Sequence, residues 1–398
     1  MNASERVNIR TPDVMLHVQA EVEKHYHSSL VDTLRNQGGT LVTGNTTIRL
    51  AKQFGFCYGV ERAIDLAYAA AKVFSNHRIF LLGEIIHNPD VNAQMQALGI
   101  RHLPPRPSAE ELETLGPDDI VVVPAFGAET HTVDKVKARG CRIVDTTCGD
   151  VMSVWKRVRQ NAREGITSII HGKSSHEETL ATASRALGAD GLGRYLVVFD
   201  LEETEKVAQF IEHGGNSATF MEQFGAVSSP GFDPIRDLQR IGLANQTTML
   251  RSETEAIQSR LHEAIMKRDG GDSSCFRVFD TICGATQERQ DSLFELLDKP
   301  LDLLVVVGGY NSSNTTHLVE IGSQRVPTWF IRNASCLSSE DEIRHYDLHL
   351  KQETSSTGWL PNSKVLSIGI TAGASCPNNL IEETIRRILS LRAEKLPA

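Results

Sequence analysis

Two similar stretches, RIVDTTCG at residues 142–149 and RVFDTICG at residues 277–284, each place a cysteine between a predicted strand and a predicted helix. Cys57, in the stretch GFCYG, lies at a corner of the same kind. The helix dipole and the free N–H groups at a helix N-terminus stabilise a thiolate by about 0.3–1 kcal/mol. Cys57, Cys148 and Cys283 are therefore candidates for reactive or metal-binding thiolates.

Three such thiolates allow more than one kind of site. The sequence contains no Cys-x-x-Cys pair, so the usual spacing of a zinc ribbon is missing. If the three cysteines meet, their sulfur atoms suit a structural zinc with a fourth ligand, or an iron–sulfur cluster with one open iron. The repeat could also reflect only a shared corner of the fold, with each cysteine packed as a small hydrophobe. Four further cysteines are expected to be structural: Cys141, Cys275, Cys336 and Cys376.

Small polar clusters follow five of the predicted strands. They contain His87, then His176 and Glu178, then Thr247, then Ser312, Ser313 and Asn314, and finally Ser375. Ligands of α/β proteins bind at the carboxyl ends of parallel strands, and hydrogen-bond donors of this kind collect phosphate oxygens. The sequence has neither a P-loop nor a Gly-x-Gly-x-x-Gly fingerprint. The clusters therefore predict a polar cavity for a small phosphorylated molecule beside a redox centre.

The elements that must position these residues alternate between strand and helix, which predicts parallel α/β layers. Apolar runs such as residues 303–307, LLVVV, are typical of strands covered on both faces. Residues 1 to about 45 show little periodicity, and residues 214–235 are predicted to be a loop or linker. We divide the chain into an N-terminal extension (1–46), three similar α/β units (47–140, 141–274 and 275–365) and a C-terminal segment that closes over the active site (366–398).

The composition narrows the class of protein. The 398 residues carry a net charge of −9, which argues against nucleic-acid binding, because such proteins need a surplus of Lys and Arg. The first residues contain no apolar signal segment, and no apolar run is long enough to cross a bilayer. We therefore expect a cytoplasmic protein, in which disulfides are not expected.

The motifs GFCYGVERA, EIIHNP, DTTCGDV, HGKSSHEET, ANQTTM, DTICGATQERQ, NSSNT and TAGASCP occur in this order. Together they resemble the motif set of the 4-hydroxy-3-methylbut-2-enyl diphosphate reductase (IspH/LytB) family, over roughly residues 47–391. The N-terminal extension resembles the longer cyanobacterial and plant type. The resemblance implies three α/β units around a central [4Fe-4S] cluster, with Cys57, Cys148 and Cys283 as its ligands and one iron open to the substrate.

The activity that the resemblance implies is the last step of the non-mevalonate isoprenoid pathway. The family removes the hydroxyl of an allylic alcohol diphosphate by reduction and forms isopentenyl and dimethylallyl diphosphate. Glu178 corresponds to the acid that relays a proton to the leaving hydroxyl, and Thr247 to the threonine that bonds the same hydroxyl. The diphosphate cradle corresponds to His87, His176, Ser312, Ser313, Asn314 and Ser375.

The sequence departs from the family at one position. Phe126 stands where many members have a histidine, and His131, five residues later, is a candidate to replace that imidazole. The family also implies ferredoxin or flavodoxin as electron donor, so we expect a basic patch, for which Lys156, Arg157 and Arg159 are candidates.

Two other classes of function stay open on the residues alone. An iron–sulfur electron carrier or redox sensor needs the cluster, but it needs neither the acid nor the diphosphate cradle. A zinc-stabilised protein that binds phosphorylated metabolites needs the cradle but no redox centre. Glu178 and the run of Ser312, Ser313 and Asn314 favour the reductase over the sensor.

Overall fold

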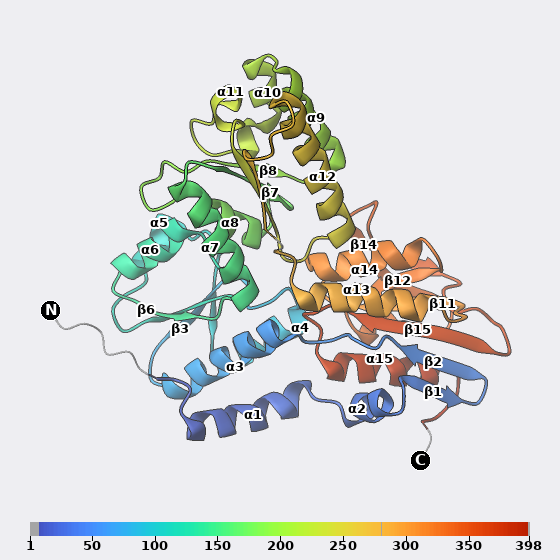
Figure 1. Cartoon of the computed structure of the whole chain (residues 1–398). Coiled ribbons are helices and arrows are strands. Elements are labelled where there is room, and N and C mark those ends of the chain that lie inside the picture. The colour runs from blue at the N-terminus through green and yellow to red at the C-terminus, as the bar shows by residue number, and fades with distance from the viewer. Residues whose placement is uncertain (1–7, 280, 397–398) are drawn as a thin grey trace. The chain divides into compact units, whose positions relative to one another are not determined.

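The structure is a computed structural model that describes residues 8–279 and 281–396 (Figure 1). It divides into two compact units, one formed by residues up to 102 together with those from 284 onward, and the other by residues 103–283. None of the helices in the described part of the chain is both long and apolar enough to cross a membrane.

The first unit is built on a five-stranded sheet. Its order is β1 (Thr40–Thr43), β2 (Thr46–Leu50), β15 (Leu366–Ala372), β11 (Leu303–Val307) and β12 (Thr328–Ile331). β1 and β2 form an antiparallel hairpin, whereas β2, β15, β11 and β12 are all parallel. Every residue of β11 is buried, as expected for a strand covered on both faces.

The helices of the first unit come from both ends of the chain. They are α1 (Pro12–Tyr26), α2 (Ser29–Asn36), α3 (Tyr58–Val73), α4 (Pro89–Ala97), α13 (Gly284–Leu297), α14 (Ser313–Ser323) and α15 (Asn378–Leu391). α13 contacts β15, and α14 contacts β11 and β12. The remaining elements are β3 (Ile79–Leu82), β4 (Arg101–Leu103), the short helix η2 (Ala334–Cys336) and the antiparallel hairpin of β13 (Glu342–Asp347) and β14 (Gln352–Thr357).

The N-terminal segment is more regular than its sequence predicts. α1 packs on α3, and the hydroxyl of Tyr68 lies 3.4 Å from that of Tyr26. α1 buries only Val18 and Tyr26, so its apolar stripe is too sparse to show as helical periodicity. Residues 12–26 and 29–36 are thus helical although the segment as a whole shows little periodicity, and α1 packs on an element that follows it in the chain.

The second unit is built on a four-stranded sheet in which all strands are parallel. Its order is β10 (Phe276–Val278), β9 (Ile241–Asn245), β7 (Thr167–His171) and β8 (Tyr195–Val198). A further parallel pair joins β5 (Ile120–Val123) to β6 (Arg142–Asp145). The helices are α5 (Ala109–Glu113), α6 (Thr130–Ala138), α7 (Gly149–Arg163), α8 (Glu177–Ala186), α9 (Leu201–His213), α10 (Ser217–Phe224), α11 (Pro234–Asp237) and α12 (Arg251–Arg268), with the short helix η1 (Gly225–Val227).

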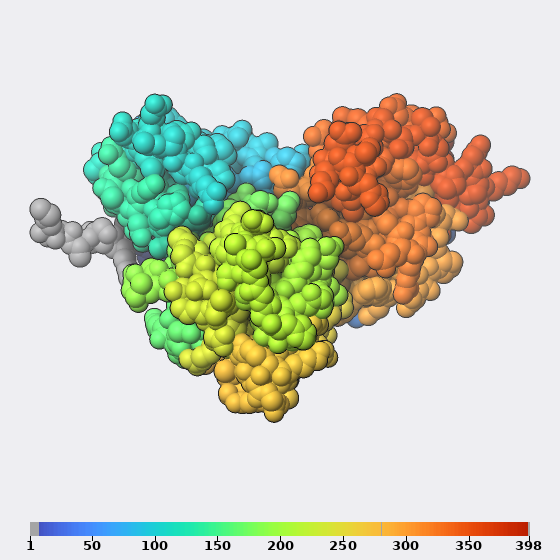
Figure 2. All heavy atoms as spheres, turned by 90° about the horizontal axis from the view of Figure 1, so that it is seen from above, coloured from blue at the N-terminus to red at the C-terminus, as the bar shows by residue number. Residues whose placement is uncertain are grey.

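The segment expected to be a linker is instead part of a core. α10 begins after Asn216, whose side chain accepts hydrogen bonds from the first turn of the helix. Phe220 and Phe224, one helical turn apart, are buried with Phe232 in a cluster that also contains residues of β8, β9, α9 and α12. In Figure 2 this part of the chain, yellow-green to gold, forms one continuous mass. The Gly, Ser and Pro residues of this segment are typical of a loop, so the sequence did not predict the helix. The three aromatic side chains are buried by residues from distant parts of the chain, and the local sequence does not show those contacts.

The structure confirms the predicted fold class, since the sheets are mostly parallel and alternate with helices. The predicted domain boundaries stay a prediction. β2, from the predicted first unit, pairs with β15 of the predicted C-terminal segment. A strand can join any parallel neighbour with an apolar face, so the local pattern does not select its partner.

Candidate active site

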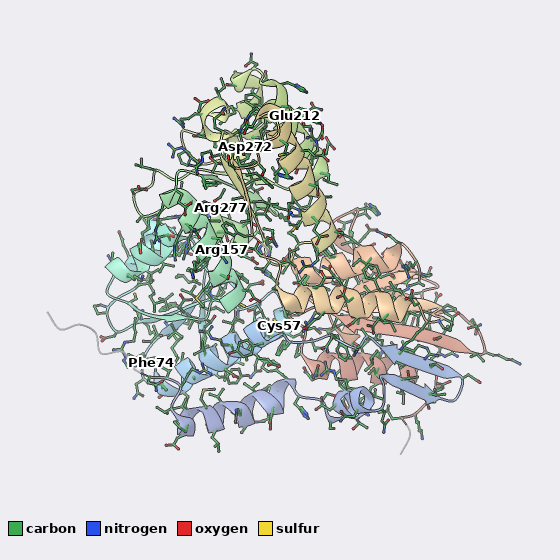
Figure 3. All side chains as sticks on the ribbon, in the orientation of Figure 1. Cys57, Phe74, Arg157, Glu212, Asp272 and Arg277 are labelled. Atoms are coloured by element: carbon green, nitrogen blue, oxygen red, sulfur yellow. The ribbon has the colours of Figure 1, made fainter. Side chains whose placement is uncertain are left out.

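The three corner cysteines occupy equivalent positions in the fold. Cys57 is the N-cap residue of α3, and Cys148 is the N-cap residue of α7. Cys283 directly precedes α13, which begins at Gly284. All three are partly exposed, and Figure 3 labels Cys57 at its end of α3. The sequence prediction of a thiol at three strand-to-helix corners is therefore confirmed.

The same backbone hydrogen bond fixes each corner. The amide N–H of the cysteine donates to the carbonyl oxygen that lies two residues beyond the end of a parallel strand. The pairs are Cys57 to Ala374 after β15 (3.3 Å), Cys148 to Ala125 after β5 (2.8 Å) and Cys283 to Thr247 after β9 (3.3 Å). The recurring bond ties each of the three cysteines to the segment that follows a parallel strand.

The repeated Asp-Thr phrase has a physical role at two of these corners. Thr146, two residues before Cys148, donates its hydroxyl to the carbonyl oxygen of Val123 at the end of β5 (2.6 Å). Thr281, two residues before Cys283, bonds through its hydroxyl to Asn245 at the end of β9. Both threonines thus tie their corner to the neighbouring strand.

The remaining cysteines lie elsewhere in the cores of the units. Cys141, Cys336 and Cys376 are buried, and Cys275 packs against the core cluster of the second unit. Complete burial raises the pKa of the Cys376 thiol, so this residue keeps its proton. All seven cysteines lie in the described part of the chain, and none forms a disulfide.

In the second unit, Glu178 and Thr247 form a buried carboxylate–hydroxyl pair. Glu178 is 3% exposed and Thr247 is 5% exposed. One carboxylate oxygen of Glu178 accepts from the backbone N–H of Thr247 (2.6 Å), and the other accepts from its hydroxyl (3.0 Å). Because the carbonyl oxygen of Thr247 also accepts from Cys283, this one residue connects the carboxylate to a cysteine corner.

His176 caps the helix that carries Glu178. Its Nδ1 accepts from the backbone N–H of Glu178 (3.1 Å), which places the ring proton on Nε2 in the neutral form. The ring of Phe126 meets it edge-on, with the ring centres 6.2 Å apart. The cap and the aromatic contact orient the imidazole, and its Nε2–H is then a donor.

In the first unit, side chains from three loops form a polar cluster. Asn314, in the first turn of α14, is 2% exposed, and its Oδ1 accepts from the backbone N–H of Ala374 (2.9 Å). Its Nδ2 has no hydrogen-bond partner among the described residues. Ser375 donates to the carbonyl oxygen of His87 (3.2 Å), and His87 Nδ1 lies 2.9 Å from a carboxylate oxygen of Glu84.

This cluster has the chemistry of an anion site. Ser312 is the N-cap residue of α14, so the positive end of the helix dipole lies beside it. The buried Nδ2 of Asn314 is a donor that costs free energy until a ligand accepts from it. The backbone of Ala374 links this cluster to the Cys57 corner, because its N–H donates to Asn314 and its carbonyl oxygen accepts from Cys57.

A comparison with models of protein families matches residues 48–389 to the family described as LytB protein. The chain belongs to the LytB family. Curated relatives named 4-hydroxy-3-methylbut-2-enyl diphosphate reductase include proteins from Gloeobacter violaceus, 47% identical over 94% of this chain and 90% of the relative, and from Thermosynechococcus vestitus, 45% identical over 94% and 92%. The family, predicted from the motifs, and its cyanobacterial type, predicted from the N-terminal extension, are thereby confirmed.

Two solved structures resemble the LytB-family fold of this chain. One is described as the structure of (E)-4-hydroxy-3-methyl-but-2-enyl diphosphate reductase, the terminal enzyme of the non-mevalonate pathway. It is 27% identical, covers 86% of this chain and 99% of its own, and has a TM-score of 0.53. The corresponding reductase from Plasmodium falciparum, 22% identical with a TM-score of 0.62 over 86% of this chain and 87% of its own, shows the fold alone.

The structure places the predicted site residues of this LytB-family chain in two groups. His87, Ser312, Asn314 and Ser375 lie in the first unit, with Ser313 as the first residue of α14, and His176, Glu178 and Thr247 lie in the second unit. The candidate replacement for the family histidine, His131, has a ring that is 57% exposed beside Glu129, as a surface residue would be. Phe126, in contrast, contacts His176 directly.

Sequence reasoning missed the groups that hold these residues in place. The carbonyl oxygens of Ala125, Thr247 and Ala374 orient the cysteines, although backbone acceptors leave no mark in a sequence. Thr146 and Thr281 did leave a signal, since both occur in the repeated DT-x-C phrase. In the sequence the phrase marks a repeat, and in the structure its threonines hold the two corners.

Proposed function

We propose that this chain is a 4-hydroxy-3-methylbut-2-enyl diphosphate reductase. The reaction breaks the bond between the allylic carbon and its hydroxyl oxygen, takes up two electrons and two protons, and releases water together with isopentenyl or dimethylallyl diphosphate. The observation that supports this activity most directly is the Glu178–Thr247 pair, because the carbonyl oxygen of the same Thr247 accepts a hydrogen bond from Cys283. The names of the relatives support the same substrate.

The cofactor that we propose is a [4Fe-4S] cluster held by Cys57, Cys148 and Cys283. The donor set fits, because each thiol lies partly exposed at a helix N-terminus, where the thiolate form is favoured. When bound, such a cluster supplies electrons and a Lewis acid. Three cysteines leave one iron without a protein thiolate, in keeping with a substrate that offers a hydroxyl oxygen.

Glu178 and Thr247 supply the proton to the leaving hydroxyl in this proposal. Hydroxide is a poor leaving group, so a positioned acid is needed. When Glu178 is protonated, its proton passes to the hydroxyl oxygen of Thr247, which then donates its own proton onward. The backbone N–H of Thr247 stays on the second carboxylate oxygen throughout and keeps the two groups aligned.

In the same proposal, the diphosphate is bound by hydrogen-bond donors from the two groups of predicted site residues, one in each unit. Asn314 Nδ2, the hydroxyls of Ser312 and Ser375, and the N-terminus of α14 belong to the first unit, with His87 beside them. His176 Nε2–H belongs to the second. Several fixed donors are needed because a diphosphate carries more than one negative charge.

The electron donor is proposed to be ferredoxin or flavodoxin, both small acidic proteins. Lys156, Arg157 and Arg159 are exposed on α7, the helix that Cys148 caps. Arg157, labelled in Figure 3, also lies 4.8 Å from the ring centre of Phe279. Reversing the charges of Lys156 and Arg159 should slow reduction by the protein donor at low salt, and equal rates would dismiss this surface. A cytoplasmic location stays a prediction from the sequence.

The experiment begins with iron and acid-labile sulfide after anaerobic purification. Cys57→Ser, Cys148→Ser and Cys283→Ser should each lose iron and turnover, whereas Cys275→Ser, also partly exposed, should keep both. Full iron and turnover in all three corner variants would overturn the ligand assignment.

The same preparation separates the other classes of function. A colourless protein that contains zinc would support a phosphometabolite-binding protein and contradict the reductase. A brown protein that fails to reduce the allylic diphosphate with an excess of chemical reductant would support a redox sensor or carrier.

A further inference from the structure

The corner at Cys57 differs from the other two in the residue that precedes it. Two residues before Cys148 and Cys283 stand Thr146 and Thr281, each tied through its hydroxyl to a neighbouring strand. Two residues before Cys57 stands Gly55, which has no side chain. A different group must therefore hold this corner.

Gly55 is required by the shape of the turn. Its φ is +82°, and a Cβ added to it would lie 2.8 Å from Asn378 Oδ1. A threonine like those at the other corners would be strained in this conformation and would meet Asn378. A threonine hydroxyl therefore cannot tie the Cys57 corner to a neighbouring strand. The groups that the turn still offers for hydrogen bonds are its backbone carbonyl oxygens.

Two arginines bind these carbonyl groups. Arg289, on α13, is 4% exposed and donates through Nη2 to the carbonyl oxygen of Gly55 (2.6 Å) and through Nη1 to that of Ala285 (2.8 Å). Arg35, on α2, donates through Nη2 to the carbonyl oxygen of Phe54 (2.8 Å), and its guanidinium lies 4.2 Å from the centre of the Phe54 ring. Hydrogen bonds from charged donors to buried acceptors are among the stronger ones in proteins.

The two cations lie close together, at a cost in electrostatic energy. The pKa of Arg35 is lowered, first by burial and also by the nearby charge of Arg289, while Asp32 and Glu61 oppose this effect. Both arginines nevertheless donate to the same turn, at the carbonyl oxygens of Phe54 and Gly55. We take this cost as a sign that the turn must be fixed in position.

We propose that Arg35 and Arg289 are positioning residues for Cys57, replacing the threonine tie of the other two corners. By fixing the carbonyl groups of Phe54 and Gly55, they keep the amide N–H of Cys57 on Ala374 and its thiol at the N-terminus of α3. Arg35 belongs to the N-terminal extension, which thereby acquires a role in holding the metal site. The metal part of this inference rests on the proposed function.

The test uses the full-length iron-free protein first, so that it does not depend on the cofactor. Hydrogen exchange of a peptide covering residues 54–58 reports the bond from Cys57 to Ala374. In Arg35→Gln and in Arg289→Gln, exchange in this peptide should be faster by about tenfold or more, as expected for loss of a hydrogen bond from a charged group. Exchange in β11 should not change.

Three further variants complete the first experiment. Arg325→Gln removes an arginine of the same unit that is 48% exposed, is paired with Asp298 and lies 5.8 Å from the centre of the Phe294 ring, away from the Cys57 turn, so it should match the parent protein. Arg289→Lys and Arg35→Lys keep the charge but lose the planar fork, and should restore part of the protection. Unchanged exchange at residues 54–58 in both Gln variants, or equal acceleration in β11, would overturn the proposal.

The second experiment measures how long the anaerobically purified protein retains its iron. The half-life of iron loss to a chelator should fall about tenfold in both Gln variants and stay constant in Arg325→Gln. Equal half-lives in all proteins would overturn the role in holding the metal. A parent protein without iron would overturn the proposed function, while the exchange result would still decide whether the arginines fix the turn.

Discussion

Replacing Glu178 by Gln, Thr247 by Val, and then both, tests whether the two residues act as one unit. Gln keeps an oxygen for the backbone N–H of Thr247, but its amide nitrogen donates, so the Thr247 hydroxyl must reverse its direction. Val keeps the shape of Thr247 and its backbone N–H but removes the hydroxyl. Both variants should fold, and each should lose roughly 1.5–3 kcal/mol of stability at most, the value of one hydrogen bond to a charged group.

The effect on turnover should be far larger than the effect on stability. A positioned general acid contributes roughly 10²–10⁴ to the rate, so Glu178→Gln should lower kcat by that factor. If the proton must pass through both groups, the double variant should lose no more than the worse single variant. Independent contributions would instead multiply, so two losses of about 10³ would give about 10⁶.

The assay is anaerobic consumption of the allylic diphosphate with a small-molecule reductant, which removes any effect on donor docking. Iron content is measured for each variant, and urea unfolding of the iron-free protein gives the stability. Glu222→Gln, an exposed position on α10, serves as the matched control. Turnover of Glu178→Gln within threefold of the parent, or multiplicative losses in the double variant, would refute the relay.

Three further predictions concern the second unit and the β13–β14 hairpin. Gly127→Ala places a Cβ 2.3 Å from the Trp155 ring at a φ of +82°, so it should lower the free energy of unfolding in urea by at least ~2 kcal/mol. Gly165→Ala is the control, because Gly165 also has a positive φ but nothing lies within 4 Å of its added Cβ, and it should lower stability less. Asn216→Ala removes the cap of α10 and should lower stability by about 1 kcal/mol, and equal midpoints would show that the cap contributes nothing. Burial lowers the pKa of His345 below 6.5, so as the pH falls the unfolded chain takes up a proton before the folded chain does. The free energy of unfolding should therefore decrease below about pH 6.5. His345→Gln should remove part of that decrease when stability is measured between pH 7.5 and pH 5.

Most of the candidate site could be predicted from the sequence because its residues follow strands in the chain. A strand-to-helix corner is a local feature, so Cys148 and Cys283 could be assigned to one from eight residues each. The polar runs at His176 and at Ser312 were predicted to follow strands for the same reason, and in the structure both residues are also N-caps of helices. Eight motifs in order were enough to identify the LytB family.

Contacts between distant segments were decided only by the tertiary structure. β2 pairs with β15 across more than 300 residues, and Arg35 reaches the Cys57 turn from α2, about 20 residues earlier in the chain. Local periodicity reports which face of an element is apolar, but it carries no information about which other element covers that face.

The sequence by itself determined the chemistry of this protein: which side chains are thiols, acids and donors, and at which ends of the strands they stand. Only the tertiary structure decided how those side chains are held, through the carbonyl oxygens of Ala125, Thr247 and Ala374, two threonine ties and two arginines. The physical reason is that a backbone acceptor is the same in every residue, so its role depends on where folding brings it and leaves no trace in residue type.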